Sequence, residues 1–158
     1  MNKTVLQHCR HPIVFVACGF GSGASPVAPG TAGTLVAIPI YLAMTQLGLF
    51  WYLLLTAVMF LVGIYLCDRT AAHFGEHDHA AIVWDEIVGF LITMSLMPVD
   101  WRWIVAGFIA FRLFDILKPW PISWMDRHVG GGFGIMLDDV AAGLAGLAVL
   151  MLVQYLLI

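Results

Sequence analysis

The hydrophobic residues of this chain form long runs that charged residues rarely interrupt. Residues 12–67 contain no Asp, Glu, Lys or Arg. A membrane crossing needs about 20 apolar residues, so this run is long enough for two crossings. The pattern predicts hydrophobic helices over residues 31–47 and 49–67, separated at Gly48. Pro39 lies inside the first helix, where a membrane helix tolerates it by kinking.

Three more hydrophobic helices are predicted after the first polar stretch, which covers residues 68–79. They cover residues 82–97, 103–117 and 140–158, and a second polar stretch, residues 118–139, precedes the last of them. The two middle helices have short uncharged portions, so full-length spans would draw Asp85, Glu86, Arg112 and Asp115 just below the membrane surface. The pattern therefore predicts an all-α, polytopic integral membrane bundle of about five helices. It forms a single domain over residues 1–158, with a polar N-terminal segment at residues 1–12.

The composition agrees with a membrane protein. The chain is 61% hydrophobic and 11% charged, with a mean hydropathy of +0.94, whereas soluble domains carry roughly 25% charged residues. Seven Lys and Arg in a chain of net charge −3 give no basic stripe for nucleic acid. Cys9, Cys18 and Cys67 form no CxxC pair, which argues against a thiolate metal site. The apolar run at residues 13–20 is too brief to indicate a cleaved signal peptide.

The distribution of basic residues predicts an orientation. Five crossings place both polar stretches on the N-terminal side, and Arg102 is then the one basic residue opposite. Positive charges favour the cytoplasmic side, so we expect the polar stretches to face the cytoplasm. The six basic residues on that side are Lys3, Arg10, Arg69, Arg112, Lys118 and Arg127.

Two acid pairs interrupt the apolar pattern in the same way. Residues 82–87 and 135–140 both read as three apolar residues, two acids and a β-branched residue, and Gly89 and Gly143 follow soon after. We expect each pair to open an apolar helix and, with Asp115, to meet on one membrane face. Such a cluster requires a cation, and hard oxygen ligands favour Mg²⁺, Mn²⁺ or Ca²⁺. The predicted ligands are Asp85, Glu86, Asp138 and Asp139. The alternative is that the acids merely complement helix dipoles.

A second group of charges predicts phosphate binding. Arg112, Asp115 and Lys118 recur every three residues and share one helical face. Arg112 suits bidentate contact with a phosphate and Lys118 a point-charge contact, although a local ion pair with snorkelling side chains is also open. Glycine-rich residues 19–23 and 29–34 can bring backbone N–H groups to the same phosphate, or can form an ordinary re-entrant turn.

The histidines of the first polar stretch leave two interpretations. His73 and His77 lie four residues apart, with Asp78 and His79 beside them, which permits zinc binding but favours an exposed loop. His79 precedes Asp85 closely enough to be a candidate for acid–base or orienting chemistry. Other phosphatase designs are excluded, because no Cys is followed six positions later by Arg and no Asp-x-Asp occurs. Metal-assisted attack by water remains.

Five ordered segments carry a family resemblance. They are residues 19–23 (GFGSG), 29–31 (PGT), 77–86, 112–121 (RLFDILKPWP) and 131–143 (GGFGIMLDDVAAG). Together the segments resemble the bacterial phosphatidylglycerophosphatase A family. The resemblance implies a Mg²⁺-dependent inner-membrane enzyme that removes the terminal phosphate of the phospholipid phosphatidylglycerophosphate. Taken together with the acid cluster and the basic residues, this activity predicts that catalysis is carried by Asp85, Asp115, Asp139 and His79, and that the phosphate is bound by Arg112, Lys118, Ser22 and Thr31.

Two further classes of function stay open at this point. Acid pairs on two similar membrane helices also suit a small cation or proton carrier. That interpretation requires polar access from both sides, and the opposite end offers Asp100 and Arg102. A structural subunit is the third class, but it gives the acids no role. The oligomeric state is not predicted.

Overall fold

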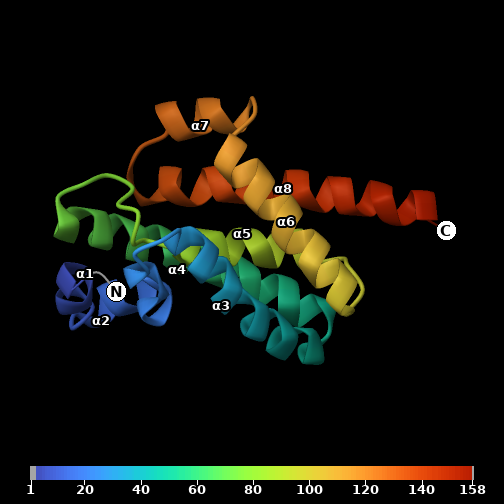
Figure 1. Ribbon diagram of the computed structural model, residues 1–158, viewed down its shortest axis with the longest axis horizontal. Coiled ribbons are helices and arrows are strands. Elements are labelled where there is room, and N and C mark those ends of the chain that lie inside the picture. Colours follow the sequence, from blue (N-terminus) through green and yellow to red (C-terminus); the bar gives the residue numbers. More distant parts are fainter. Residues whose placement is uncertain (1–2, 158) are drawn as a thin grey trace.

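The computed structural model describes residues 3–157, and these residues form helices joined by turns (Figure 1). This confirms the predicted all-α class. The elements in chain order are α1 (Lys3–His8), α2 (Pro12–Ala17), the 3₁₀ helix η1 (Gly19–Ala24), α3 (Pro29–Met44), the 3₁₀ helix η2 (Thr45–Leu47), α4 (Leu49–Phe74), α5 (Trp84–Met94), α6 (Trp101–Leu117), α7 (Ile122–His128) and α8 (Gly131–Leu157).

Three helical segments are long and apolar enough to cross a membrane. They are α3 with η2, α4 and α8, which contain 19, 26 and 27 residues. The 11 residues of α5 rise about 16 Å, roughly half of the ~30 Å hydrocarbon core, and the 17 residues of α6 rise about 25 Å. Three of the five predicted membrane helices are therefore long and apolar enough to cross a membrane, whereas α5 and α6 are shorter.

Two of the long helices extend beyond their predicted bounds. Helix α4 continues through Asp68 and Arg69 and stops at Gly75, whose φ of 71° ends the helix. Helix α8 begins at Gly131, well before the expected start at residue 140. The prediction placed the end of α4 and the start of α8 at charged residues, but the backbone hydrogen bonds of a helix continue through charged residues. The acid pair Asp138–Asp139 therefore lies about two turns inside α8 and does not open it.

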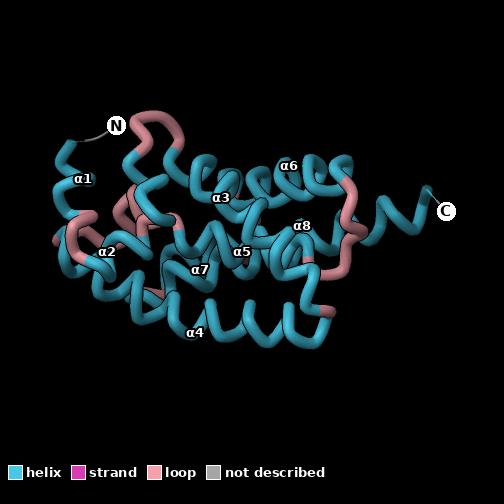
Figure 2. The backbone as a smooth tube through the Cα atoms, turned by 90° about the horizontal axis from the view of Figure 1, so that it is seen from below, coloured by secondary structure: helices cyan, strands magenta, loops and turns pink. Residues whose placement is uncertain are grey.

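Helix α5 is the centre of the bundle. Nine of its 11 residues are buried, and it lies among α3, α4, α6 and α8 in both views of the backbone (Figures 1 and 2). Two hydrogen bonds tie α5 to α4: Tyr52 Oη donates to the Leu91 carbonyl at 2.6 Å, and Trp84 Nε1 donates to the Met59 carbonyl at 3.0 Å. These bonds fix the position of α5 along the bundle axis.

Helices α5 and α8 cross at two glycines. A Cβ on Gly143 would lie 2.5 Å from the Gly89 carbonyl oxygen, so the two backbones are in direct contact. The Thr93 hydroxyl lies 3.0 Å from the Gly89 carbonyl and 3.2 Å from that of Gly143. Gly89 follows Asp85, and Gly143 follows Asp139, by four residues, so each glycine shares a helix face with an acid. The crossing thus brings the two acid-bearing turns together.

The N-terminal segment and the two polar stretches, residues 68–79 and 118–139, gather at one end of the bundle, which we call the polar end (Figure 1). The turns that join α3 to α4 and α5 to α6 lie at the opposite end (Figure 1). The short helices α1 and α2 contribute Val5 and Val14 to a small buried cluster at the polar end. The predicted polar N-terminal segment is therefore largely helical and packs on the bundle.

Candidate active site

A cavity of about 280 Å³ opens at the polar end, where α5 and α8 begin near the end of α6. Six acidic and two basic side chains line it, so negative groups are in clear excess. Charges removed from water require compensation, which points to a cation or a positively charged ligand group. The lining residues are Ala28, Pro29, Gly30, Asp78, Ala80, Ile82, Asp85, Glu86, Arg112, Asp115, Ile116, Lys118, Asp138 and Asp139.

Three of the acids form a group that could hold a metal ion. Asp85, Glu86 and Asp139 each offer a carboxylate oxygen, and these oxygens lie within 4.8 Å of one another. Each residue also has a buried carboxylate oxygen that finds no hydrogen-bond partner among the described residues. Buried oxygens of this kind are costly unless something binds them. A set of hard oxygen donors with free lone pairs fits a divalent cation.

Arg112 lies beside this acid group and is held by two carboxylates. Its Nη1 donates a hydrogen bond to Asp115 and lies 3.7 Å from Glu86 Oε1. The Arg112 side chain is 14% exposed, and its Nε is buried without a partner in the described chain. The guanidinium is therefore oriented firmly and keeps a donor available for an anion in the cavity.

Lys118 directly follows α6, and its side chain links α7 to α8 at the edge of the cavity. Its ammonium donates to Asp126 Oδ1 and Asp138 Oδ2, each at 2.6 Å. Burial by itself lowers the pKa of Lys118, but these two hydrogen bonds outweigh it and the pKa is raised overall. The side chain therefore stays charged. Asp138 lies outside the three-residue metal group: its Oδ2 binds this lysine, and its Oδ1 is buried without a partner among the described residues.

Gly30 closes the cavity from the side of α3. A Cβ at this position would lie 2.2 Å from Glu86 Oε1 and 2.9 Å from Arg112 Nη1. The first turn of α3 thus fits against the Glu86–Arg112 pair because residue 30 has no side chain. In the segment of residues 29–34, the role of this glycine is to leave room for the Glu86 and Arg112 side chains.

Three predicted site residues lie outside the described cavity lining. The His79 ring stacks on Phe74 with centroids 4.0 Å apart, and its Nδ1 accepts a hydrogen bond from the Ala81 N–H at 3.1 Å. The Ser22 hydroxyl donates to the Cys18 carbonyl at 3.5 Å. Thr31 follows Gly30 in the first turn of α3 but is not one of the lining residues.

The histidines of the first polar stretch are separated in the structure. His73 Nε2 lies 2.9 Å from His8 Nδ1, whereas His77 Nε2 accepts a hydrogen bond from the Gly131 N–H at 3.0 Å. Among residues 3–157, the group able to hold a metal consists of Asp85, Glu86 and Asp139 and includes no histidine. The geometry therefore favours a carboxylate site over a zinc site.

Sequence reasoning missed the places of three residues. Asp78 lies in an exposed turn, as predicted, but it also lines the cavity; its position in the third resembling segment was the available signal. Asp126 binds Lys118 across the turn that leads into α7, and no local pattern marks it. Gly30 belongs to a segment for which backbone N–H donation or an ordinary re-entrant turn was predicted, and the structure adds a steric role that the sequence did not indicate.

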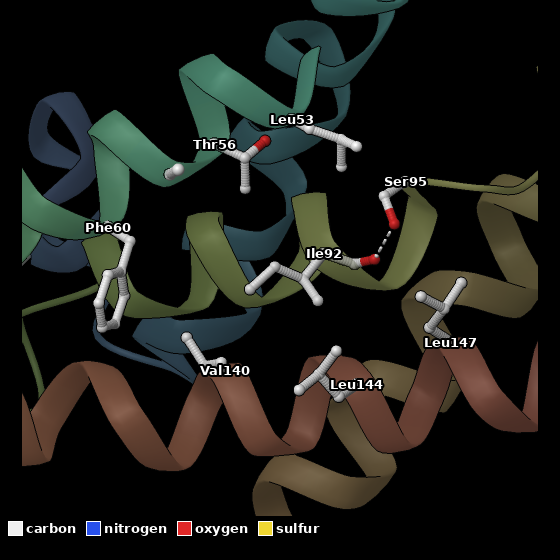
Figure 3. Close-up of a pocket in the computed structure, with 9 residues that line it drawn as sticks. Leu53, Thr56, Phe60, Ile92, Ser95, Val140, Leu144 and Leu147 are labelled. Carbon is white, nitrogen blue, oxygen red and sulfur yellow. Dashed lines mark hydrogen bonds between the residues drawn. The ribbon is translucent and has the colours of Figure 1, made fainter. Parts of the chain in front are cut away.

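A second hollow of about 330 Å³ lies among α4, α5 and α8 (Figure 3). It is lined mostly by apolar side chains such as Leu53, Phe60 and Leu144. Its hydroxyl groups are bound to their own helices. Ser95 Oγ donates to the Ile92 carbonyl at 2.8 Å (Figure 3), and Thr56 Oγ1 donates to the Tyr52 carbonyl at 2.8 Å. This hollow offers volume without reactive groups, so the chemistry belongs to the acidic cavity.

Comparison with known proteins identifies the family. The family model for phosphatidylglycerophosphatase A matches residues 15–154. The chain belongs to the phosphatidylglycerophosphatase A family. Membership confirms the resemblance noted in the sequence and makes the chain an enzyme, a phosphatase.

Members of the phosphatidylglycerophosphatase A family from two bacteria are close relatives of the chain. The Escherichia coli (strain K12) phosphatidylglycerophosphatase A is 49% identical over 141 residues, which cover 89% of this chain and 82% of the relative. The Haemophilus influenzae phosphatidylglycerophosphatase A is 46% identical over 147 residues, covering 92% and 90%. A Bacteroides thetaiotaomicron relative, 41% identical over 138 residues with coverage of 82% and 86%, is named instead for a phosphatidylinositol-3-phosphatase activity. No solved structure matches the chain.

Proposed function

We propose that this chain hydrolyses the terminal phosphomonoester of phosphatidylglycerophosphate, releasing phosphatidylglycerol and inorganic phosphate in phospholipid biosynthesis. The observation that carries this proposal is the acidic cavity, which combines a three-carboxylate group with Arg112 and Lys118 at the polar end of membrane helices. The names of the Escherichia coli and Haemophilus influenzae relatives support the substrate. One domain over the whole chain performs the reaction.

Asp85, Glu86 and Asp139 would hold a divalent cation, for which we propose Mg²⁺. A divalent cation in such a site supplies charge neutralisation and Lewis acidity to a phosphoryl group. Asp138 contributes by binding Lys118, so its predicted place among the metal ligands becomes a positioning role.

Arg112 and Lys118 bind the non-bridging oxygens of the phosphate and oppose the negative charge that spreads over them in the transition state. Asp115 orients the Arg112 guanidinium. Of the two residues considered for proton transfer, Asp115 lines the cavity and His79 does not. We therefore assign Asp115 to accept the proton of the attacking water. The bond between phosphorus and the lipid glycerol oxygen breaks as the new bond to water forms.

The polar end faces the cytoplasm of the bacterial inner membrane in this proposal. Six of the seven Lys and Arg of the chain lie toward it, and α5 and α6 form a hairpin that enters the bilayer beside the three spanning helices. The lipid tails can then remain in the bilayer while the headgroup reaches the cavity. A carrier is disfavoured because at the opposite end the Asp100 carboxylate caps its own helix, accepting from the Arg102 N–H at 2.8 Å.

The test is phosphate release by the purified protein in lipid vesicles. Phosphatidylglycerophosphate should be hydrolysed with Mg²⁺ and not after EDTA treatment, and Asp139→Asn should be inactive in both conditions. Phosphatidylinositol 3-phosphate serves as the competing substrate, given the third relative. Release that is insensitive to EDTA would overturn the metal assignment, and preferential hydrolysis of the inositol lipid would overturn the substrate.

A further inference from the structure

A shallow groove of about 290 Å³ runs along the outer face of α6. Phe108, Ile109, Leu113 and Leu117 line it together with Arg112 and Ile116. The last two residues also line the acidic cavity. The apolar groove and the acidic cavity therefore meet at Arg112 and Ile116.

The groove is an exposed apolar surface on a membrane protein. Ile109, Leu113, Ile116 and Leu117 are 60%, 52%, 66% and 66% exposed, and they lie on one side of α6. From Ile109 to Leu117 the helix rises about 12 Å, most of the depth of one ~15 Å leaflet. Exposed apolar side chains at this depth contact lipid chains.

The acidic cavity is bounded on this side by α6 and the start of α3. Ala28, Pro29 and Gly30 face Arg112 and Ile116 across the cavity. Gly30 packs closely against the Glu86–Arg112 pair, but α3 otherwise contacts α6 sparsely. A headgroup can therefore approach Arg112 sideways, from the bilayer.

We propose that one acyl chain of the lipid substrate lies in the α6 groove while the phosphate of the same molecule reaches Arg112. This inference rests on the proposed lipid phosphatase function and adds the route by which the substrate binds. The larger apolar hollow among α4, α5 and α8 shares no lining residue with the acidic cavity (Figure 3). A chain bound there would not place its headgroup at Arg112, so the α6 groove is the better site.

Photo-crosslinking tests the location without requiring activity. The probe is a diacylglycerol phosphomonoester with a diazirine on one acyl chain, diluted in phosphatidylcholine vesicles that contain the parent protein. Crosslinks should be enriched at residues 108–117 relative to the same diazirine lipid without its phosphate, and Arg112→Gln should remove the enrichment. Equal labelling by both lipids, or enrichment at Leu53 and Leu144, would overturn the proposal.

Kinetics with two substrates test the role of the groove. Leu113→Trp fills it and should lower kcat/KM about tenfold for a long-chain substrate, since a few methylene groups no longer pack, but less than twofold for a water-soluble short-chain analogue. The control is Leu61→Trp on α4, a position 64% exposed and remote from the groove, which should change neither value. Equal loss on both substrates, or loss on neither, contradicts the proposal. A parent protein that hydrolyses neither substrate contradicts the proposed function, while the crosslinks still decide whether lipid occupies the groove.

Discussion

The carbonyl oxygen of Gly89 lies 2.5 Å from the point that a Cβ on Gly143 would occupy. Two helices can approach this closely only where neither has a side chain. Because each glycine follows an acid by one turn, the contact determines how far apart Asp85 and Asp139 lie. The metal group therefore depends on a packing contact that contains no charged atom.

Gly143→Ala should separate α5 from α8 and weaken both stability and activity. The added methyl group overpacks the crossing, at a cost of about 1–3 kcal/mol, and moves Asp139 away from Asp85 and Glu86. Thermal unfolding and phosphate release in one detergent measure the two effects. The control is Gly146→Ala, whose Cβ would meet the Thr93 methyl group at 3.1 Å and requires a small shift. Equal behaviour of the two variants would show that the crossing does not position the acids.

Gly30→Ala should lose activity while keeping its fold. The new methyl group would displace Glu86 and Arg112, whose side chains can move, whereas alanine is about 1 kcal/mol better than glycine inside a helix. Phosphate release should fall with little change in the unfolding temperature. Gly130→Ala is the matched control, because nothing lies within 4 Å of the added atom. Normal turnover by Gly30→Ala would contradict the steric role assigned to Gly30.

Asp85→Asn and Asp139→Asn should remove the stabilisation that Mg²⁺ gives to the folded protein. A ligand that binds the folded state at a hundred times its Kd stabilises it by about 2.7 kcal/mol. The parent should therefore unfold at a higher temperature with Mg²⁺, and the two variants should not respond. Glu76→Gln, at an exposed carboxylate outside the cavity, should respond like the parent. If Mg²⁺ raises the unfolding temperature of Asp139→Asn as much as that of the parent, the ion binds at another site.

Lys118 and Asp138 should act as a unit. Lys118→Met removes a phosphate contact and should lower kcat/KM by on the order of 10²-fold. Asp138→Asn should cost less, because it disturbs the lysine without removing it. In the double variant the Asp138 change should add little, which a double-mutant cycle measures. Fully additive losses would show that Asp138 has a separate role.

The sequence was sufficient to predict the main helices and the centre of the site. Runs without charge predicted α3 and α4, because apolar residues of that length need a membrane. Acids are expensive within apolar helices, which is why Asp85, Glu86 and Asp139 could be selected from the pattern, together with Asp138. The structure places these three together as the group able to hold a metal.

The remaining features depend on contacts between distant elements. The start of α8 at Gly131 was missed because charge was taken as the end of a helix. Asp126 and Asp138 meet at Lys118 through the turn before α7, and no local pattern encodes that turn. His79 was selected for its closeness to Asp85 along the chain, but its ring stacks on Phe74. The steric role of Gly30 required knowledge of where α6 lies.

Helix α5 carries two of the three acids of the metal group, yet nine of its 11 residues are buried by the helices around it. The surrounding helices supply nearly all of the surface that meets lipid. Their outward side chains can therefore change to suit membranes of different thickness or fluidity while the reactive centre stays the same. This separation offers a route for engineering: the outer surface can be redesigned for detergent solubility, provided that α5 and its glycine contact with α8 are left intact.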